Sequence, residues 1–79
     1  MNEDRLNRIT VNPLICNGKP TIRNIRITVQ TILEFLTNGD SIEDILKAYP
    51  VLEREDILSC ISFALKGLET HKNEYQIAS

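Results

Sequence analysis

The sequence predicts a mainly α fold: a three-helix, helix-turn-helix-like core of the winged-helix or homeodomain-like kind, preceded by a short N-terminal β-arm or hairpin. Two observations predict it. Apolar residues repeat at helical spacing from residue 28 to residue 68, with two interruptions by helix-ending residues. Residues 8–27 instead combine β-branched side chains with turn residues. The 79 residues suffice for a single domain, which we divide into a basic arm (8–27), a helical core (28–68) and a polar tail (69–79).

The arm is shaped by three residues with restricted or unusual backbone preferences. Gly18 follows an asparagine in a turn signal, and Pro20 excludes a helix while permitting an edge strand. Asn24 suits a bend, because asparagine tolerates the left-handed backbone region better than most residues. A two-stranded ribbon is unstable alone, so the arm should pack on the helices or pair with another chain. The extended segments are predicted at 8–11, 21–22 and 25–27.

Three helices follow the arm. The first has Thr28 as its N-cap and Gly39 as its C-terminal stop. The second opens with a capping box formed by residues 41–44 and is closed by Pro50. The third begins near Glu53 and extends to about residue 68. Its apolar positions are Ile57, Leu58, Ile61, Ala64, Leu65 and Leu68.

Charge is distributed unevenly along the chain. The block from Arg5 to Arg26 holds five Lys or Arg and no Asp or Glu, a charge of +5, although the whole chain carries −2. After residue 30, four basic and nine acidic residues give −5. Such a polarised molecule offers one face to a polyanion and another to a different partner.

The third helix is an unfavourable DNA-recognition helix, because its first turn is acidic. Glu53, Glu55 and Asp56 would face phosphates, and Arg54 alone does not compensate them. We interpret the adjacent acidic pair at 55–56, like the pair at 43–44, as part of a solvated face. A β-arm can enter a major groove and is the better candidate; the alternative for its basic residues is a solvated edge that discourages strand aggregation. The predicted DNA-binding residues are Lys19, Arg23, Arg26, Arg8 and Arg54.

Nothing in the sequence indicates catalysis, and no cofactor or metal is expected. His71 is the only histidine and lies in the polar tail, and residues 18–20 lack the second glycine and the hydroxyl of a phosphate-binding loop. Cys60 is expected to be a small buried residue, whereas Cys16 lies in a loop without an activating base. The acidic start and the absence of a long apolar run predict a cytoplasmic protein with no membrane segment.

A series of short motifs runs through the arm and the helices in a fixed order. They are Gly18-Lys19-Pro20, Ile22-Arg23, Arg26-Ile27 with Val29, Gly39 with Ser41, Glu43, Ile45-Leu46, Tyr49-Pro50, Leu52 and Glu55-Asp56-Ile57. Together they resemble the bacterial domain-of-unknown-function family 433. The resemblance covers about three quarters of the chain and implies similarity to antitoxins of VapB type: small helix-turn-helix-like proteins, often encoded beside a PIN-like ribonuclease toxin, which neutralise the toxin and repress their own operon.

The chain departs from the family pattern at two places. Asn24 and Ile25 replace a usual Gly-Thr pair, which keeps the bend but removes a hydroxyl group. Glu53 replaces a threonine, which removes an N-cap and adds charge to the third helix.

Two functions from different classes follow. In the first, the protein is a dimeric antitoxin that binds double-stranded operator DNA through the arm and a PIN-like toxin through its C-terminal region. In the second, it is a protein-interaction module of helix-turn-helix fold without DNA binding. A homodimer is expected in either case, because a domain this small gains stability by association.

Overall fold

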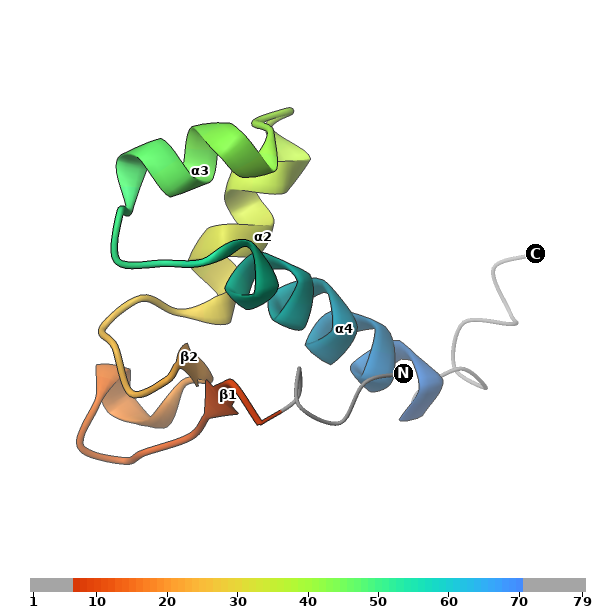
Figure 1. Cartoon of the computed structure of the whole chain (residues 1–79). Coiled ribbons are helices and arrows are strands. Elements are labelled where there is room, and N and C mark those ends of the chain that lie inside the picture. The colour runs from red at the N-terminus through yellow and green to blue at the C-terminus, as the bar shows by residue number, and fades with distance from the viewer. Residues whose placement is uncertain (1–6, 71–79) are drawn as a thin grey trace.

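The chain folds into three helices and a two-stranded antiparallel hairpin within residues 7–70, which are the residues that the computed structural model describes. Strands β1 (Ile9–Thr10) and β2 (Thr21–Ile22) precede helices α2 (Val29–Thr37), α3 (Ile42–Ala48) and α4 (Arg54–Thr70). Figure 1 shows α3 and the hairpin at opposite ends of the molecule, with α2 and the first half of α4 between them. The predicted mainly helical fold with a short β-arm is therefore confirmed.

The hairpin is shorter than the extended segments predicted from the sequence. Two residue pairs, Ile9 with Ile22 and Thr10 with Thr21, make up its register. Residues 25–27, which were expected to be extended, form no strand, because the chain turns directly after β2 and returns toward α2.

Left-handed backbone conformations shape the arm. Gly18 has φ +80° and ends a single 3-10 turn, η1 (Cys16–Gly18). The expected bend after β2 is present, with φ of 47° at Arg23 and 60° at Asn24. The Asn24 amide donates a hydrogen bond to the Thr10 hydroxyl (2.9 Å), which ties the bend to β1. A positive φ at Arg23 is costly for a residue with a long side chain, so other contacts must hold it.

The predicted caps of the first two core helices are confirmed. The Thr28 hydroxyl accepts the Thr31 amide at the start of α2 (3.1 Å). Ser41 and Asp44 form both bonds of a capping box at the start of α3, each 3.1 Å long. The last helix, α4, extends two residues beyond its predicted end and reaches Thr70.

The core lies where the three helices and β2 meet, and it includes the predicted buried cysteine. Only one side of α4 contributes, because Ile61, Leu65 and Leu68 remain 42%, 51% and 51% exposed. The apolar repeat predicted for this helix thus divides between a buried side and an outer side. The buried hydrophobic residues are Ile22, Val29, Ile32, Ile45, Leu52, Ile57 and Cys60.

Among the described helices, none is both long and apolar enough to cross a lipid bilayer. Most of the predicted polar tail, including His71, lies outside the described residues.

Candidate functional site

A buried carboxylate near the start of α4 lies at the centre of a group of charged side chains. Asp56 is fully buried. Arg23 donates to it twice, from Nε to Oδ1 (3.0 Å) and from Nη2 to Oδ2 (2.8 Å). Arg8 Nη1 donates to Asp56 Oδ1 (3.0 Å) and to Glu53 Oε1 (2.7 Å). We call Arg8, Arg23, Glu53 and Asp56 the arginine–carboxylate cluster; it joins the arm to α4.

The position of Asp56 follows from the way α4 begins. Because Arg54 is the first helical residue, Asp56 is the third, from which a side chain reaches back to the residue before the helix. Its Oδ2 accepts the Glu53 amide (2.8 Å), so the carboxylate caps the helix while it binds the arginines. A negative charge is also favourable at this end of the helix dipole.

Arg23 reaches Asp56 because of the bend after β2. Its Nη2 also donates to the Val51 carbonyl in the loop before α4 (3.1 Å). The guanidinium therefore connects this loop to the first turn of α4. The backbone of Arg23 is left-handed, with φ 47°. Such a conformation costs on the order of 1 kcal/mol, and the paired hydrogen bonds to a carboxylate are strong enough to offset it.

Arg8, Arg23 and Asp56 are charged at neutral pH. Burial alone would raise the pKa of Asp56, but hydrogen bonds from Arg23, the Glu53 amide and Arg8 outweigh it and hold that pKa below its usual value. Hydrogen bonds to Glu53 and Asp56 raise the pKa of Arg8, and the bond to Asp56 raises the pKa of Arg23. Arg8, Arg23 and Asp56 therefore form an ion network.

The structure corrects our interpretation of Asp56 as a solvated carboxylate. Its neighbour in sequence, Glu55, is half-buried, while Asp56 is fully buried and turned toward the arm. Sequence reasoning treated the acidic pair as diverging on an exposed face and missed that one member meets residues far away in the chain. One signal was available in the sequence: Asp56 is the third residue of a helix that has no Ser or Thr N-cap, and from that position a carboxylate can cap the helix itself.

The five residues predicted to bind DNA separate into two groups. Arg8 and Arg23 belong to the arginine–carboxylate cluster, with 28% and 38% of their side chains exposed. Arg54 is exposed and forms a surface pair with Glu43 (3.4 Å). Lys19 and Arg26 are exposed and form no ion pair within residues 7–70. The structure thus brings two of the five predicted residues together, because Arg8 and Arg23 both bind the Asp56 carboxylate.

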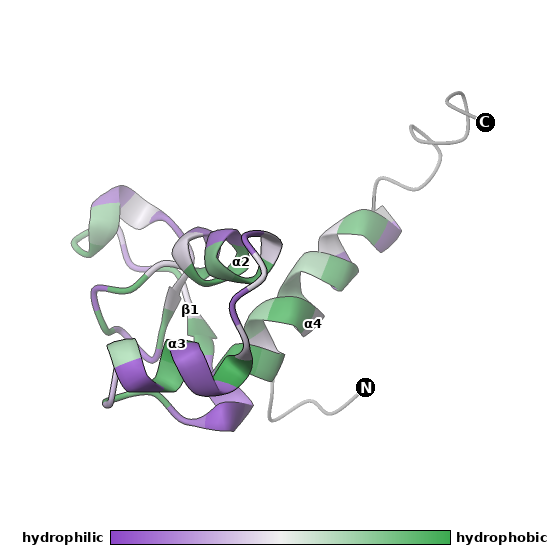
Figure 2. Cartoon of the chain, turned by 90° about the horizontal axis from the view of Figure 1, so that it is seen from above, coloured by the Kyte–Doolittle hydropathy of each residue, from purple (hydrophilic) through white to green (hydrophobic). Residues whose placement is uncertain are grey.

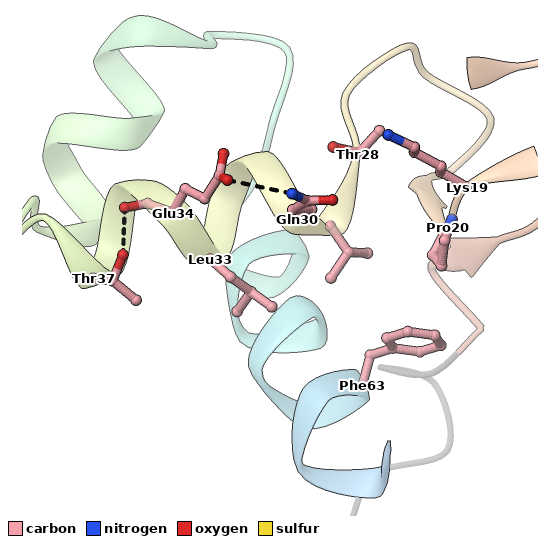
Figure 3. Close-up of a pocket in the computed structure, with 9 residues that line it drawn as sticks. Lys19, Pro20, Thr28, Gln30, Leu33, Glu34, Thr37 and Phe63 are labelled. Carbon is pink, nitrogen blue, oxygen red and sulfur yellow. Dashed lines mark hydrogen bonds between the residues drawn. The ribbon is translucent and has the colours of Figure 1, made fainter. Parts of the chain in front are cut away.

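An apolar groove lies between α2, α4 and the start of β2. Its volume is about 390 Å³. Figure 3 shows Leu33 from α2 and Phe63 from α4 pointing into the same space, with Pro20 at one side. Lys19 and Glu34 place opposite charges on its rim. Sequence reasoning did not identify this groove, because its residues come from three separate segments. Its lining consists of Lys19, Pro20, Thr28, Val29, Gln30, Leu33, Glu34, Thr37 and Phe63.

Comparison with known proteins identifies the family. Residues 9–64 match the model of a protein family of unknown function, DUF433. The chain belongs to this family. The DUF433 chain is also similar to the crystal structure of a DUF433 member protein from Anabaena variabilis, with 31% sequence identity, a TM-score of 0.74, and coverage of 86% of this chain and 67% of that one. A comparison with curated proteins finds no match.

The match covers most of the site in this DUF433 protein. Arg23, Glu53 and Asp56 lie within it, as do all the residues that line the groove, whereas Arg8 immediately precedes it. Leu65 and Leu68, on the outer side of α4, follow its end. The groove and most of the cluster are therefore part of the family's own segment, and the last turns of α4 are not.

Proposed function

We propose that this DUF433 protein is the antitoxin of a VapB-like type II toxin–antitoxin pair, which acts in the cytoplasm by binding a PIN-like ribonuclease toxin and operator DNA. The resemblance of its motifs to such antitoxins supports the proposal. The observation that carries the toxin-binding part is the apolar groove between α2 and α4.

The groove has the composition of a protein-binding site. Leu33, Phe63 and Pro20 supply apolar contact, and Lys19 and Glu34 supply a charged rim. Protein interfaces combine a desolvated apolar centre with a polar border in this way. A volume of about 390 Å³ is in the range of pockets that enclose a bound group. In the proposed complex, an apolar side chain of the toxin enters the groove.

Titration of the purified protein with the product of the adjacent gene tests the toxin contact. We expect Leu33→Ala to weaken binding about tenfold or more, because a central apolar anchor typically contributes that much. Leu14→Ala is the matched control: Leu14 is 85% exposed and does not line the groove. Circular dichroism shows whether both variants remain folded. Unchanged affinity of folded Leu33→Ala would refute the groove as the contact, and absence of binding by the wild type would refute the toxin assignment.

The DNA-binding part of the proposal rests on the basic residues outside the cluster. Lys19 and Arg26 are exposed and free of ion pairs in the described part of the chain, and Arg54 has only a surface pair. Arg8 and Arg23 are held by carboxylates and would need to break those bonds to reach phosphate. We therefore assign DNA contact to Lys19 and Arg26, with Arg54 as a further contact.

A gel-shift of the upstream DNA at two salt concentrations tests this assignment. We expect binding that weakens as salt increases, since phosphate contacts release counterions. The double variant Lys19→Ala with Arg26→Ala should bind less tightly and show a smaller salt dependence, whereas Lys47→Ala, an exposed lysine on α3, should behave like the wild type. Equal loss in both variants would contradict a specific role of the arm.

One observation favours the second candidate, a protein-interaction module without DNA binding. Two of the five basic residues predicted for DNA, Arg8 and Arg23, bond Asp56 and have a structural use. Retained binding to the adjacent gene's product, together with no salt-sensitive shift of DNA at either concentration, would select this candidate.

A further inference from the structure

The outer side of α4 carries a continuous row of apolar residues. Leu58, Ile61, Leu65 and Leu68 follow one another at alternating spacings of three and four residues. This spacing places side chains on one face of a helix and is the pattern of helices that pack along their length. We call these four residues the outer stripe.

The outer stripe is exposed in the single chain. Ile61, Leu65 and Leu68 are 42%, 51% and 51% exposed, and Leu58 is half-buried. Figure 2 shows that the C-terminal half of α4 extends away from α2 and α3, with bands of its ribbon coloured as hydrophobic. Single exposed leucines are common, but a contiguous apolar row marks an interaction surface.

The two ends of the outer stripe carry opposite charges, so they match the charges of a second stripe that runs in the opposite direction. Arg54 precedes Leu58 by four residues on the same face, and Glu69 directly follows Leu68. Both are largely exposed, with side chains 61% and 56% accessible. Their present partners are surface residues at 3.4 Å and 3.9 Å, which is a weak form of pairing.

We propose that two copies of this protein associate through the outer stripe, with their α4 helices packed antiparallel about a two-fold axis beside residues 61 and 62. Leu65 then meets Leu58 of the second copy, because the two positions are equally distant from the axis. Ile61 lies beside the second copy's Ile61, and Arg54 meets the second copy's Glu69 for the same reason. The Leu65–Leu58 and Arg54–Glu69 contacts each occur twice, and the Ile61–Ile61 contact lies across the axis and occurs once, as two-fold symmetry requires.

The charges favour the antiparallel arrangement over the parallel one. Parallel helices would place Arg54 beside a second Arg54 and Glu69 beside a second Glu69, and they would align the two helix dipoles. The inference is independent of the antitoxin proposal, because the stripe and the groove lie on different residues of α4. A three-turn seam is small for an interface, so we expect dissociation in the micromolar range.

Sedimentation equilibrium of the full chain from about 10 µM to about 1 mM tests the proposal. We expect the wild type to approach twice the chain mass of 9.0 kDa as concentration rises. Leu65→Glu should remain close to the mass of one chain, with a dimer weakened at least tenfold. Leu14→Glu, the same change at an exposed position outside α4, should dimerise like the wild type. A wild type that stays monomeric throughout, or a dimer that Leu65→Glu leaves intact, overturns the proposal.

A charge-reversal pair tests the antiparallel orientation without altering apolar residues. Arg54→Glu should weaken the dimer by roughly three- to thirtyfold, since two exposed pairs become repulsive. Adding Glu69→Arg restores opposite charges across an antiparallel interface and should recover the affinity. Failure of the double variant to recover overturns the antiparallel packing. Both positions are exposed, so this comparison stands even where Leu65→Glu unfolds the chain.

Discussion

Replacement of Asp56 by asparagine should destabilise the protein more than any other single change of one carboxylate to an amide among the described residues. The Asp56 carboxylate accepts three hydrogen bonds from the two arginines and one from the Glu53 amide. An asparagine side chain at this position would keep one oxygen acceptor, but its NH₂ group would replace the other oxygen with a donor and the side chain would carry no negative charge. The arm then loses its ionic contacts with Asp56 and keeps only the pair between Arg8 and Glu53.

The expected loss of stability depends on how far Asp56 and its two arginine partners are buried. Removal of one partner from a fully buried ion pair costs about 3–5 kcal/mol. Here Asp56 is fully buried, but Arg8 and Arg23 keep 28% and 38% of their side chains exposed, so water replaces part of what they lose. We therefore expect a loss of about 2–3 kcal/mol of unfolding free energy, out of a total of ~4–12 kcal/mol for a domain of this length. The thermal midpoint should fall by roughly 10–20 °C.

Urea unfolding followed by circular dichroism at neutral pH measures this change. Glu43→Gln is the matched control, because it removes one carboxylate from an exposed pair at 3.4 Å and should cost at most about 0.5 kcal/mol. If Asp56→Asn and Glu43→Gln have equal stability, the arginine–carboxylate cluster does not hold the arm and the reasoning is wrong.

The same variant should change the acid sensitivity of the fold. The pKa of Asp56 is lower in the folded chain than its usual value near 4, so its ionic form stabilises the fold above about pH 5, and this contribution disappears as pH falls through the folded-state pKa. The stability difference between wild type and Asp56→Asn should therefore shrink on acidification. A difference that stays constant from neutral pH to about pH 3 would contradict an ionic role for this side chain.

Three further predictions concern the helices and the thiols. Thr28→Ala should lower the unfolding free energy by about 1 kcal/mol in urea titrations, since it removes the N-cap of α2, and Thr28→Ser should retain most of it. Gly39→Ala should cost about 1 kcal/mol by the same measurement, because φ is +94° there, although the added methyl group would meet no atom within 4 Å. Burial raises the pKa of the Cys60 thiol to about 12, so a thiol reagent at about pH 8 should modify Cys16 first; equal rates in the native protein would contradict the buried position of Cys60.

The parts of the fold predicted from the sequence are those fixed by local interactions. Thr28 and Ser41 cap helices through bonds to residues three positions away, and the pattern alone indicates them. The bend at Asn24 was predictable for a similar reason, because its backbone preference is intrinsic. The motifs that resemble the family fall in these same segments, around the bend and at the starts of the helices.

The parts that the sequence did not predict depend on residues distant along the chain. Asp56 and Arg23 are 33 positions apart, and neither has a neighbour that reveals the other. The groove requires α2, α4 and β2 to be placed together, so its lining has no sequence pattern of its own. The strands were overestimated because β-branched residues at 25–27 indicate an extended chain, whereas after the tight turn only the Ile27 carbonyl, which accepts the Ile22 amide (3.2 Å), and an isolated bridge between Thr28 and Thr21 pair with β2.

The arm is held against the helices by charge as well as by the burial of Ile22 in the core, and this has a consequence for hydrogen exchange. A two-residue ribbon by itself would open readily and exchange its amide protons quickly. The Arg23 amide, however, donates to the Arg8 carbonyl (2.7 Å) between the two arginines that bind Asp56. Movement of the arm away from α4 would also break the bonds of both guanidinium groups to their buried carboxylate. The arm and the start of α4 should therefore exchange as one cooperative unit, with protection near that of global unfolding, instead of fraying as an independent edge.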